Sequence, residues 1–225
     1  MKEGITMKIM IIGGSGRVGT ALTEDFVKNT NDEITVAVGH PEKATQFKDL
    51  PNVNVIKFDF ANLKIEQITA MLKGYDAIYF VAGSRGKSPV QVDSFGAIKT
   101  MIAAQKAGVS RYIMLSSFGA LQPDQWIGNP KYASLQAYQA AKFMADHYLI
   151  HDTDLNYTIL QPSSLTEKTG TGKVALNEDE KSTENPIPDV AEVLFQILNN
   201  KNTYKKVILM HSGATPIKSA LDNLK

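Results

Sequence analysis

The stretch Met7–Gly19 reads Met-Lys-Ile-Met-Ile-Ile-Gly-Gly-Ser-Gly-Arg-Val-Gly and decides the fold. Its apolar run, Ile9–Ile12, predicts a buried parallel strand. The strand leads directly into a cluster of glycines, Gly13, Gly14, Gly16 and Gly19. Glycine allows the sharp turn and the close backbone approach that a pyrophosphate requires. A helix that begins near Arg17 would then point its free N–H groups at the phosphates, so the stretch predicts a dinucleotide site.

Two glycine registers fit this loop. Gly14–Gly19 matches G-x-G-x-x-G, whereas Gly13, Gly16 and Gly19 match the spacing G-x-x-G-x-x-G. The glycines alone do not choose between the registers, and a glycine-rich turn without a ligand is the simpler alternative. The strand before the loop and the helix after it favour binding. The predicted cofactor contacts in this loop are Gly13, Gly14, Ser15, Gly16, Arg17, Val18 and Gly19.

Composition limits the class of protein. A chain of 225 residues, 43% hydrophobic and 21% charged, can bury a substantial core, and we expect one domain over residues 1–225. The net charge is +1, with lysines and arginines scattered among acids, which argues against nucleic acid and membrane partners. The absence of cysteine excludes disulfides and a cysteine nucleophile. With no signal-like or membrane-length apolar run, we expect a cytoplasmic protein.

Apolar, β-branched runs alternate with helical patterns along the chain. We expect strands at 9–12, 34–38, 53–58, 77–81, 112–115, 157–160 and 207–210, and helices at 18–29, 41–49, 65–72, 92–107, 135–151 and 189–199. This alternation predicts an α/β fold with a doubly wound parallel sheet. Residues 161–188 include a stretch rich in Thr, Gly, Glu, Asn and Pro, and we expect a small C-terminal substrate region with a loop or lid there.

Residues just past the strands are the natural ligand contacts in such a sheet. After the second strand the chain reads Gly39-His40-Pro41-Glu42-Lys43, without the acid at the tip that would hold the ribose 2′-hydroxyl of NAD. Arg17, with His40 or Lys43, could instead meet a 2′-phosphate. The sequence therefore favours NADP(H) over NAD(H), although these cations could simply be solvated.

The next two strand ends also offer cofactor contacts. Asp59 and Phe60 follow the third strand, where the carboxylate could accept a hydrogen bond from the adenine amino group. Small residues follow the fourth strand, at Val81, Ala82 and Gly83, where ribose could approach the backbone. Each segment could equally be an ordinary turn.

The candidate chemistry lies further along the chain. Tyr138 and Lys142 are four residues apart on the predicted helix 135–151, so they share one face. The ammonium would favour the phenolate and make the phenol a better proton donor. Ser116 and Ser117 end a strand, where a hydroxyl could hydrogen-bond a substrate carbonyl. An isolated Tyr and Lys at this spacing usually reflect packing, but here they follow a dinucleotide loop and a serine strand end.

Taken in their order along the chain, these motifs resemble those of the short-chain dehydrogenase/reductase superfamily. The match covers most of the chain and is best to the atypical, single-domain branch, which includes NmrA-like and NAD-dependent epimerase/dehydratase-related proteins. The resemblance implies a Rossmann-type fold in which Tyr138 is the proton donor and Lys142 binds the nicotinamide ribose. Ser117 matches the substrate-orienting serine better than Ser116, though a shift of one residue stays open. Cofactor contacts are implied for Ser116, Lys142, Gln161 and Pro162.

The resemblance implies an NAD(P)H-dependent oxidoreductase that reduces a small carbonyl, quinone or related acceptor by hydride transfer. Two alternatives stay open: an NmrA-like sensor of the dinucleotide that performs no turnover, and an epimerase or dehydratase with tightly bound NAD. The partner we expect is a small-molecule substrate. By resemblance, the helices 92–107 and 135–151 are candidate homodimer surfaces, although packing on the sheet also explains their apolar faces. His147 and His151 have the spacing of a zinc pair but no evident third ligand, so we expect no metal site.

Overall fold

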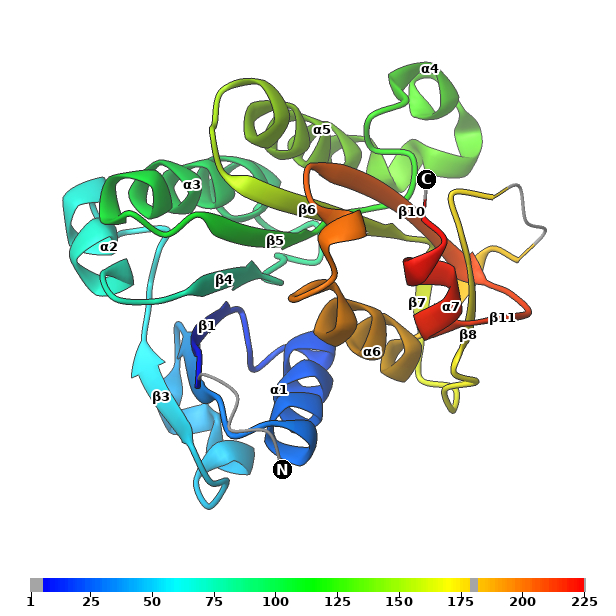
Figure 1. The fold of residues 1–225 in the computed structure, drawn as a ribbon. Coiled ribbons are helices and arrows are strands. Elements are labelled where there is room, and N and C mark those ends of the chain that lie inside the picture. Colours follow the sequence, from blue (N-terminus) through cyan, green and yellow to red (C-terminus); the bar gives the residue numbers. More distant parts are fainter. Residues whose placement is uncertain (1–5, 179–181, 225) are drawn as a thin grey trace.

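The computed structural model describes residues 6–178 and 182–224 of the chain. Within these residues a nine-stranded sheet runs through the molecule in the order β11-β8-β10-β6-β5-β4-β1-β2-β3 (Figure 1). Its seven parallel strands are β1 (Lys8–Ile12), β2 (Glu33–Val38), β3 (Val53–Lys57), β4 (Ala77–Phe80), β5 (Arg111–Leu115), β6 (Asn156–Pro162) and β10 (Lys206–Ser212). The chain crosses over between β3 and β4, so the sheet is doubly wound and the predicted α/β, Rossmann-type class is confirmed.

The strand that the glycine-containing stretch predicted, β1, lies in the interior of the sheet. β1 lies between β2 and β4, with Ile12 opposite Ala37 on one side and Phe80 on the other. All four residues of Ile9–Ile12 are fully buried, because helices cover both faces of the sheet. The position of β1 places the loop that follows it at the switch point of the strand order.

Helices form a layer on each face of the sheet (Figure 1). On one face α1 (Arg17–Asn29) packs against α6 (Ile187–Ile197), and α7 (Ile217–Asp222) joins the same core. On the other face lie α2 (Ile65–Leu72), α3 (Phe95–Ala107) and α5 (Gln136–His151). The short helix α4 (Pro123–Trp126) precedes α5. A π-helical turn, Pro89–Ser94, leads into α3.

One predicted helix is wrong. Residues 41–49 form two separate 3₁₀ turns, Pro41–Lys43 and Thr45–Phe47, rather than one α-helix. Ala44, between the turns, has φ −94° and ψ 43°, outside the α-helical region. Only Ala44 and Phe47 are buried here, so the segment has too small an apolar face to hold an α-helix against the core.

The segment 161–188 is more ordered than a loop. It contains β7 (Ser164–Thr166), β8 (Lys173–Leu176) and β9 (Glu184–Pro186). β8 pairs antiparallel with β10 and with β11 (Thr215–Pro216), while β7 and β9 form a separate two-stranded sheet. Val174, Ala175 and Leu176 are buried, so this part of the expected surface excursion extends the main sheet.

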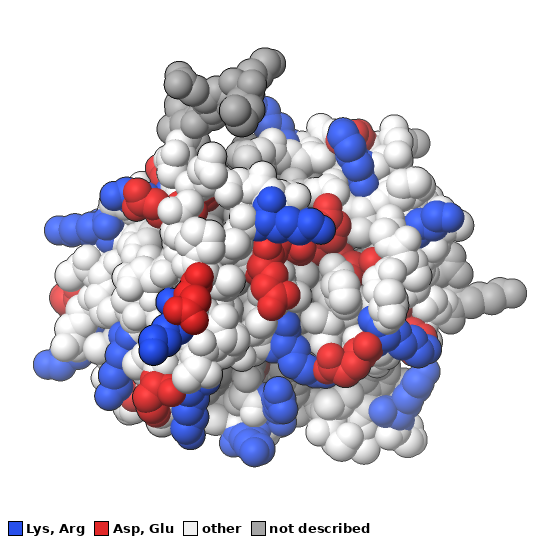
Figure 2. Space-filling view, turned by 90° about the horizontal axis from the view of Figure 1, so that it is seen from below, with Lys and Arg blue, Asp and Glu red and all other residues white. Residues whose placement is uncertain are grey.

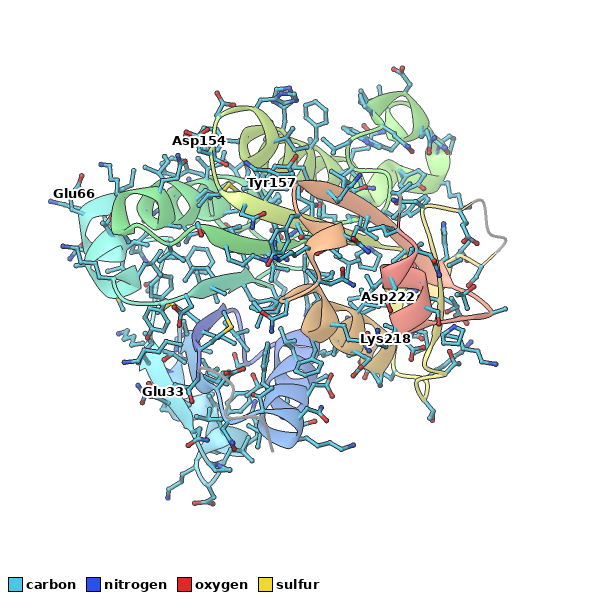
Figure 3. All side chains as sticks on the ribbon, viewed as in Figure 1. Glu33, Glu66, Asp154, Tyr157, Lys218 and Asp222 are labelled. Atoms are coloured by element: carbon cyan, nitrogen blue, oxygen red, sulfur yellow. The ribbon has the colours of Figure 1, made fainter. Side chains whose placement is uncertain are left out.

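The surface carries mixed charge. Figure 2 shows basic and acidic side chains interspersed over one face of the molecule. Some lie close enough to pair, such as Lys218 and Asp222 on α7, which are labelled in Figure 3. Among the described residues no helix is both long and apolar enough to cross a membrane.

Candidate functional site

A cavity of about 1650 Å³ lies along the carboxyl ends of the parallel strands. The glycine loop after β1 forms one wall. Gly13 has φ +84°, and a Cβ there would lie 2.4 Å from the Cα of Ala82. A Cβ on Gly19 would lie 2.5 Å from the Cα of Gly14. These two glycines therefore let the loop pass close to β4 and let α1 start close to β1.

The glycine loop divides into residues that face the cavity and residues that pack. Gly13, Ser15, Gly16, Arg17 and Val18 line the cavity, whereas Gly14 and Gly19 are not among its lining residues. Gly16 is the N-cap of α1, has no side-chain cap, and no acid lies in the first turn. The helix therefore presents its N-terminal N–H groups and positive dipole end to an anion, and this donor set fits a pyrophosphate.

The predicted adenosine end of the cavity is formed by the loops after β2 and β3. Gly39, His40, Asp59 and Phe60 line it. Lys43 is exposed and is not among the lining residues. The lining residues after β2 are not acidic.

Arg17 bridges two parts of the site. Its Nη1 donates to Glu167 Oε1 at 2.7 Å, which links the glycine loop to the segment after β7. Both side chains are substantially exposed, at 46% and 70%. Arg17 is thus held at the cavity wall by a pair that solvent screens.

The predicted catalytic residues line the same cavity. Ser117, Tyr138 and Lys142 all line the cavity, as do Val81, Ala82, Gly83 and Pro162. Lys142 is only 2% exposed, and its Nζ donates to Leu115 O at 3.1 Å. The same Nζ lies 3.8 Å from Asp93 Oδ1 and 5.7 Å from the centre of the Tyr138 ring. The buried ammonium is therefore anchored beside the half-buried phenol.

The two serines after β5 differ in orientation. Ser116 Oγ donates to Asp146 Oδ2 at 2.7 Å, so its hydroxyl is engaged with α5. Gln161 does not line the cavity, because its Nε2 donates to the same carboxylate oxygen at 2.7 Å. Of the two predicted serines, Ser117 is the one outside this buried network.

Several polar residues of the site were not predicted. Asp93 is fully buried and accepts hydrogen bonds from the backbone and side chain of Ser84. Asp146 is fully buried beside Ser116. A helical spacing argument could have found Asp146, since it lies four residues after Lys142. No sequence pattern pointed to Asp93, because its partners come from other segments of the chain.

The far end of the cavity, beyond the predicted cofactor contacts, also escaped the sequence analysis. Its lining includes Phe118, Gln122, Gln125, Lys131, Tyr132, Gln139, Asn177, Leu209 and His211. The His211 ring packs on Phe118 with centroids 4.5 Å apart, and its Nδ1 has no hydrogen-bond partner among the described residues. His211 lies just past the apolar core of β10, so the strand-end rule could have found it.

The fold and this cavity define a Rossmann-type nucleotide-binding protein. A sequence model described as NAD(P)H-binding matches residues 13–201, and the chain belongs to this NAD(P)H-binding family. The chain is similar to the "Uncharacterized sugar epimerase YhfK" of Bacillus subtilis, with 34% identity over 97% of this chain and 100% of that protein. It is also similar to the "UPF0659 protein YMR090W" of Saccharomyces cerevisiae, with 33% identity over 97% of this chain and 99% of that one.

Solved structures show the same fold. The oxidoreductase ylbE from Lactococcus lactis is 41% identical, with a TM-score of 0.89 over 97% of this chain and 96% of that one. A short-chain dehydrogenase/reductase from Veillonella parvula in complex with NADP has a TM-score of 0.74 at 18% identity, over 94% of this chain and 97% of that one. At that identity the likeness supports the fold alone. Together with the family match, these likenesses agree with the predicted atypical branch of the short-chain dehydrogenase/reductases.

Proposed function

We propose that this protein is an NADP(H)-dependent oxidoreductase that reduces a small carbonyl, quinone or related acceptor. One observation carries the proposal: Ser117, Tyr138 and Lys142 line the same cavity as the glycine loop. A dinucleotide bound to that loop would extend along the strand ends toward these side chains. The similarity to a protein named as an oxidoreductase, 41% identical, supports the same reaction class.

Each residue has a distinct role in this reaction. A reduced nicotinamide, when bound along the glycine loop, would supply the hydride for the carbonyl carbon. Tyr138 donates its phenolic proton to the carbonyl oxygen, so that one hydride and one proton yield the alcohol. Ser117 hydrogen-bonds the same oxygen and orients it. Lys142, fixed by its bond to Leu115 O, stabilises the phenolate that remains.

The preference for NADP(H) rests on the residues at the adenosine end. Arg17 and His40 line the cavity there, and neither lining residue after β2 offers a carboxylate to a ribose 2′-hydroxyl. An arginine and an imidazole suit a 2′-phosphate. Lys43 has no part in this proposal, because it does not line the cavity.

Two other functions share this geometry and are outcomes of the test. The Bacillus subtilis relative is named as a sugar epimerase, and a Dictyostelium discoideum relative, 28% identical over 58% of this chain, is named as NmrA-like. Epimerases retain tightly bound NAD through purification. A sensor would bind the cofactor without oxidising it.

The experiment compares wild type with Tyr138→Phe. Loss of NADPH and NADH absorbance is followed across a panel of quinones, aldehydes and ketones, and cofactor affinity is measured separately by fluorescence. We expect turnover in the wild type and a loss of at least about a hundredfold in the variant, because the proton donor is removed. Cofactor affinity should be nearly unchanged, since the phenyl ring remains.

Ala140→Ser is the matched control, because residue 140 lies on the same helix turn and does not line the cavity. This variant should oxidise the reduced cofactor at the same rate as the wild type. Binding without turnover in every protein would favour the sensor. NAD that copurifies with the protein would favour the epimerase.

A further inference from the structure

Asp146 lies on α5 in line with the proposed catalytic residues Tyr138 and Lys142. Tyr138, Lys142 and Asp146 follow one another at intervals of four residues, so they share one face of the helix. Tyr138 and Lys142 line the cavity, whereas Asp146 lies further along the helix and is fully buried. A buried carboxyl directly behind a catalytic pair needs a physical explanation.

The two carboxylate oxygens of Asp146 differ in their hydrogen bonds. Its Oδ2 accepts from Ser116 Oγ and from Gln161 Nε2, each at 2.7 Å. Its Oδ1 has no hydrogen-bond partner among the described residues. Burial raises the pKa of Asp146 to about 7, while the two hydrogen bonds and the charge of Lys142 act in the opposite direction. The carboxyl therefore exchanges its proton near neutral pH.

The groups that face Asp146 form a small charge cluster. Its hydrogen-bond partners among the described residues are the uncharged Ser116, just after β5, and Gln161 on β6, and the charge of Lys142 on its own helix also acts on it. Lys142 in turn lies 3.8 Å from the buried Asp93, and neither side chain is more than 3% exposed. The cluster therefore carries one more negative charge when Asp146 is ionised than when Asp146 holds a proton.

Two members of this network also line the cavity, Ser116 and Lys142. Under the proposed function, on which this step rests, the nicotinamide lies beside them. The oxidised ring is a cation and the reduced ring is neutral, so only the oxidised ring interacts with the net charge of the cluster. In a buried site such an interaction is only weakly screened.

We propose that Asp146 is a proton-exchanging site coupled to the redox state of the bound nicotinamide. Ionised Asp146 favours the oxidised, cationic ring. The reduced, neutral ring leaves Asp146 freer to hold its proton. Binding of the oxidised cofactor therefore releases more protons from the protein than binding of the reduced cofactor does.

The test measures binding of NADP⁺ by calorimetry and of NADPH by fluorescence, at pH 6 and at pH 8. We expect the ratio of the Kd for NADP⁺ to the Kd for NADPH to fall about fivefold over this range, which is the change that a coupling of about one pKa unit produces between pH 6 and pH 8. The ratio isolates the nicotinamide ring, because any pH dependence that the two redox forms share cancels in it.

Asp146→Asn is the decisive variant. Its amide oxygen still accepts from Ser116 and Gln161, so the hydrogen-bonded link between α5, β5 and β6 is kept while the titrating charge is removed. The ratio should then be the same at both pH values. Asp25→Asn is the matched control: burial, together with the charge of Glu192, raises the pKa of Asp25 to about 6, but Asp25 does not line the cavity. It should keep the wild-type ratio at both pH values.

A pH-independent ratio in the wild type would overturn the proposal, as would a pH-dependent ratio in Asp146→Asn. If Asp146→Asn does not fold, a second measurement on the wild type tests the proposal. Calorimetry at pH 7 in two buffers of different ionisation enthalpy must then show more proton release with NADP⁺ than with NADPH. Binding without turnover would contradict the proposed function and leave this proposal standing. Failure to bind either redox form would contradict both.

Discussion

Arg17 illustrates how one side chain can serve two partners. In the structure it pairs with Glu167, whereas the proposed cofactor preference assigns it to a 2′-phosphate. Because both members of the pair are exposed, the pair contributes little to stability, and a phosphate dianion competes with it readily. Substitution of Arg17 and substitution of its partner Glu167 should therefore have opposite effects on the affinity for NADPH.

We expect Arg17→Ala to weaken NADPH binding about tenfold or more while changing the Kd for NADH only slightly, since NADH has no 2′-phosphate. Glu167→Gln should do the reverse and tighten NADPH, because it frees the guanidinium. Both Kd values are measured by fluorescence titration at one salt concentration. Equal losses for the two cofactors in Arg17→Ala would mean that the arginine does not contact the 2′-phosphate.

The glycine loop and the helix it starts behave as one element with two kinds of glycine. A Cβ on Gly16 would approach only Gly13 O, at 3.2 Å, and Gly16 lines the cavity. A Cβ on Gly19 would lie 2.5 Å from the Cα of Gly14, inside the contact between loop and helix. Gly16 therefore leaves space for the ligand, whereas Gly19 allows the loop and α1 to pack closely.

This difference predicts that Gly16→Val abolishes dinucleotide binding with little change in the melting temperature of the free protein. Gly19→Val should instead lower the melting temperature by roughly 10 °C or more, because backbone atoms must move apart. Circular dichroism without cofactor gives the melting temperatures, and fluorescence titration gives the affinities. Tight binding by Gly16→Val would contradict the phosphate-binding role of the loop.

At the scale of elements, the sequence predicts what is long and periodic. The buried strands and the helices α1, α2 and α5 follow from apolar runs and helical spacing, and their predicted limits lie within a residue or two of the observed ones. β7, β8 and β9 have only three or four residues each, too few for a period. Their pairing comes from distant partners, as Val174 with Ser212 shows.

The candidate site was predicted only in part for the same reason, because sequence patterns are local. The glycine loop, the strand ends and the Tyr138–Lys142 stripe are local patterns, and the structure brings them to one cavity. Asp93, Asp146 and His211 acquire their environment from other segments: Asp93 from Ser84, Asp146 from Ser116 and Gln161, and His211 from Phe118. Burial of a polar group is a tertiary property, so its consequences could not be predicted from spacing.

The whole molecule leaves apolar side chains exposed on the face formed by α3 and α5. Phe95 is 48% exposed and Met144 is 53% exposed, and Ser94 Oγ, just before α3, donates to Met144 Sδ on α5 at 3.7 Å. Val90, in the turn before α3, is 63% exposed. Large apolar side chains that share one face are typical of protein interfaces. We propose that this face forms the homodimer contact.

The prediction is a dimer in size-exclusion chromatography with light scattering, and a monomer for Met144→Glu, because a buried unpaired carboxylate at the contact would cost several kcal/mol. Ile127→Glu is the control for an exposed apolar residue outside α3 and α5: Ile127 is 61% exposed and follows α4, whose Trp126 O accepts a hydrogen bond from Gln136 at the start of α5. It should remain dimeric. A wild type that stays monomeric at every concentration tested would exclude the contact. Dissociation by Ile127→Glu alone would move the interface to the α4 side of the molecule.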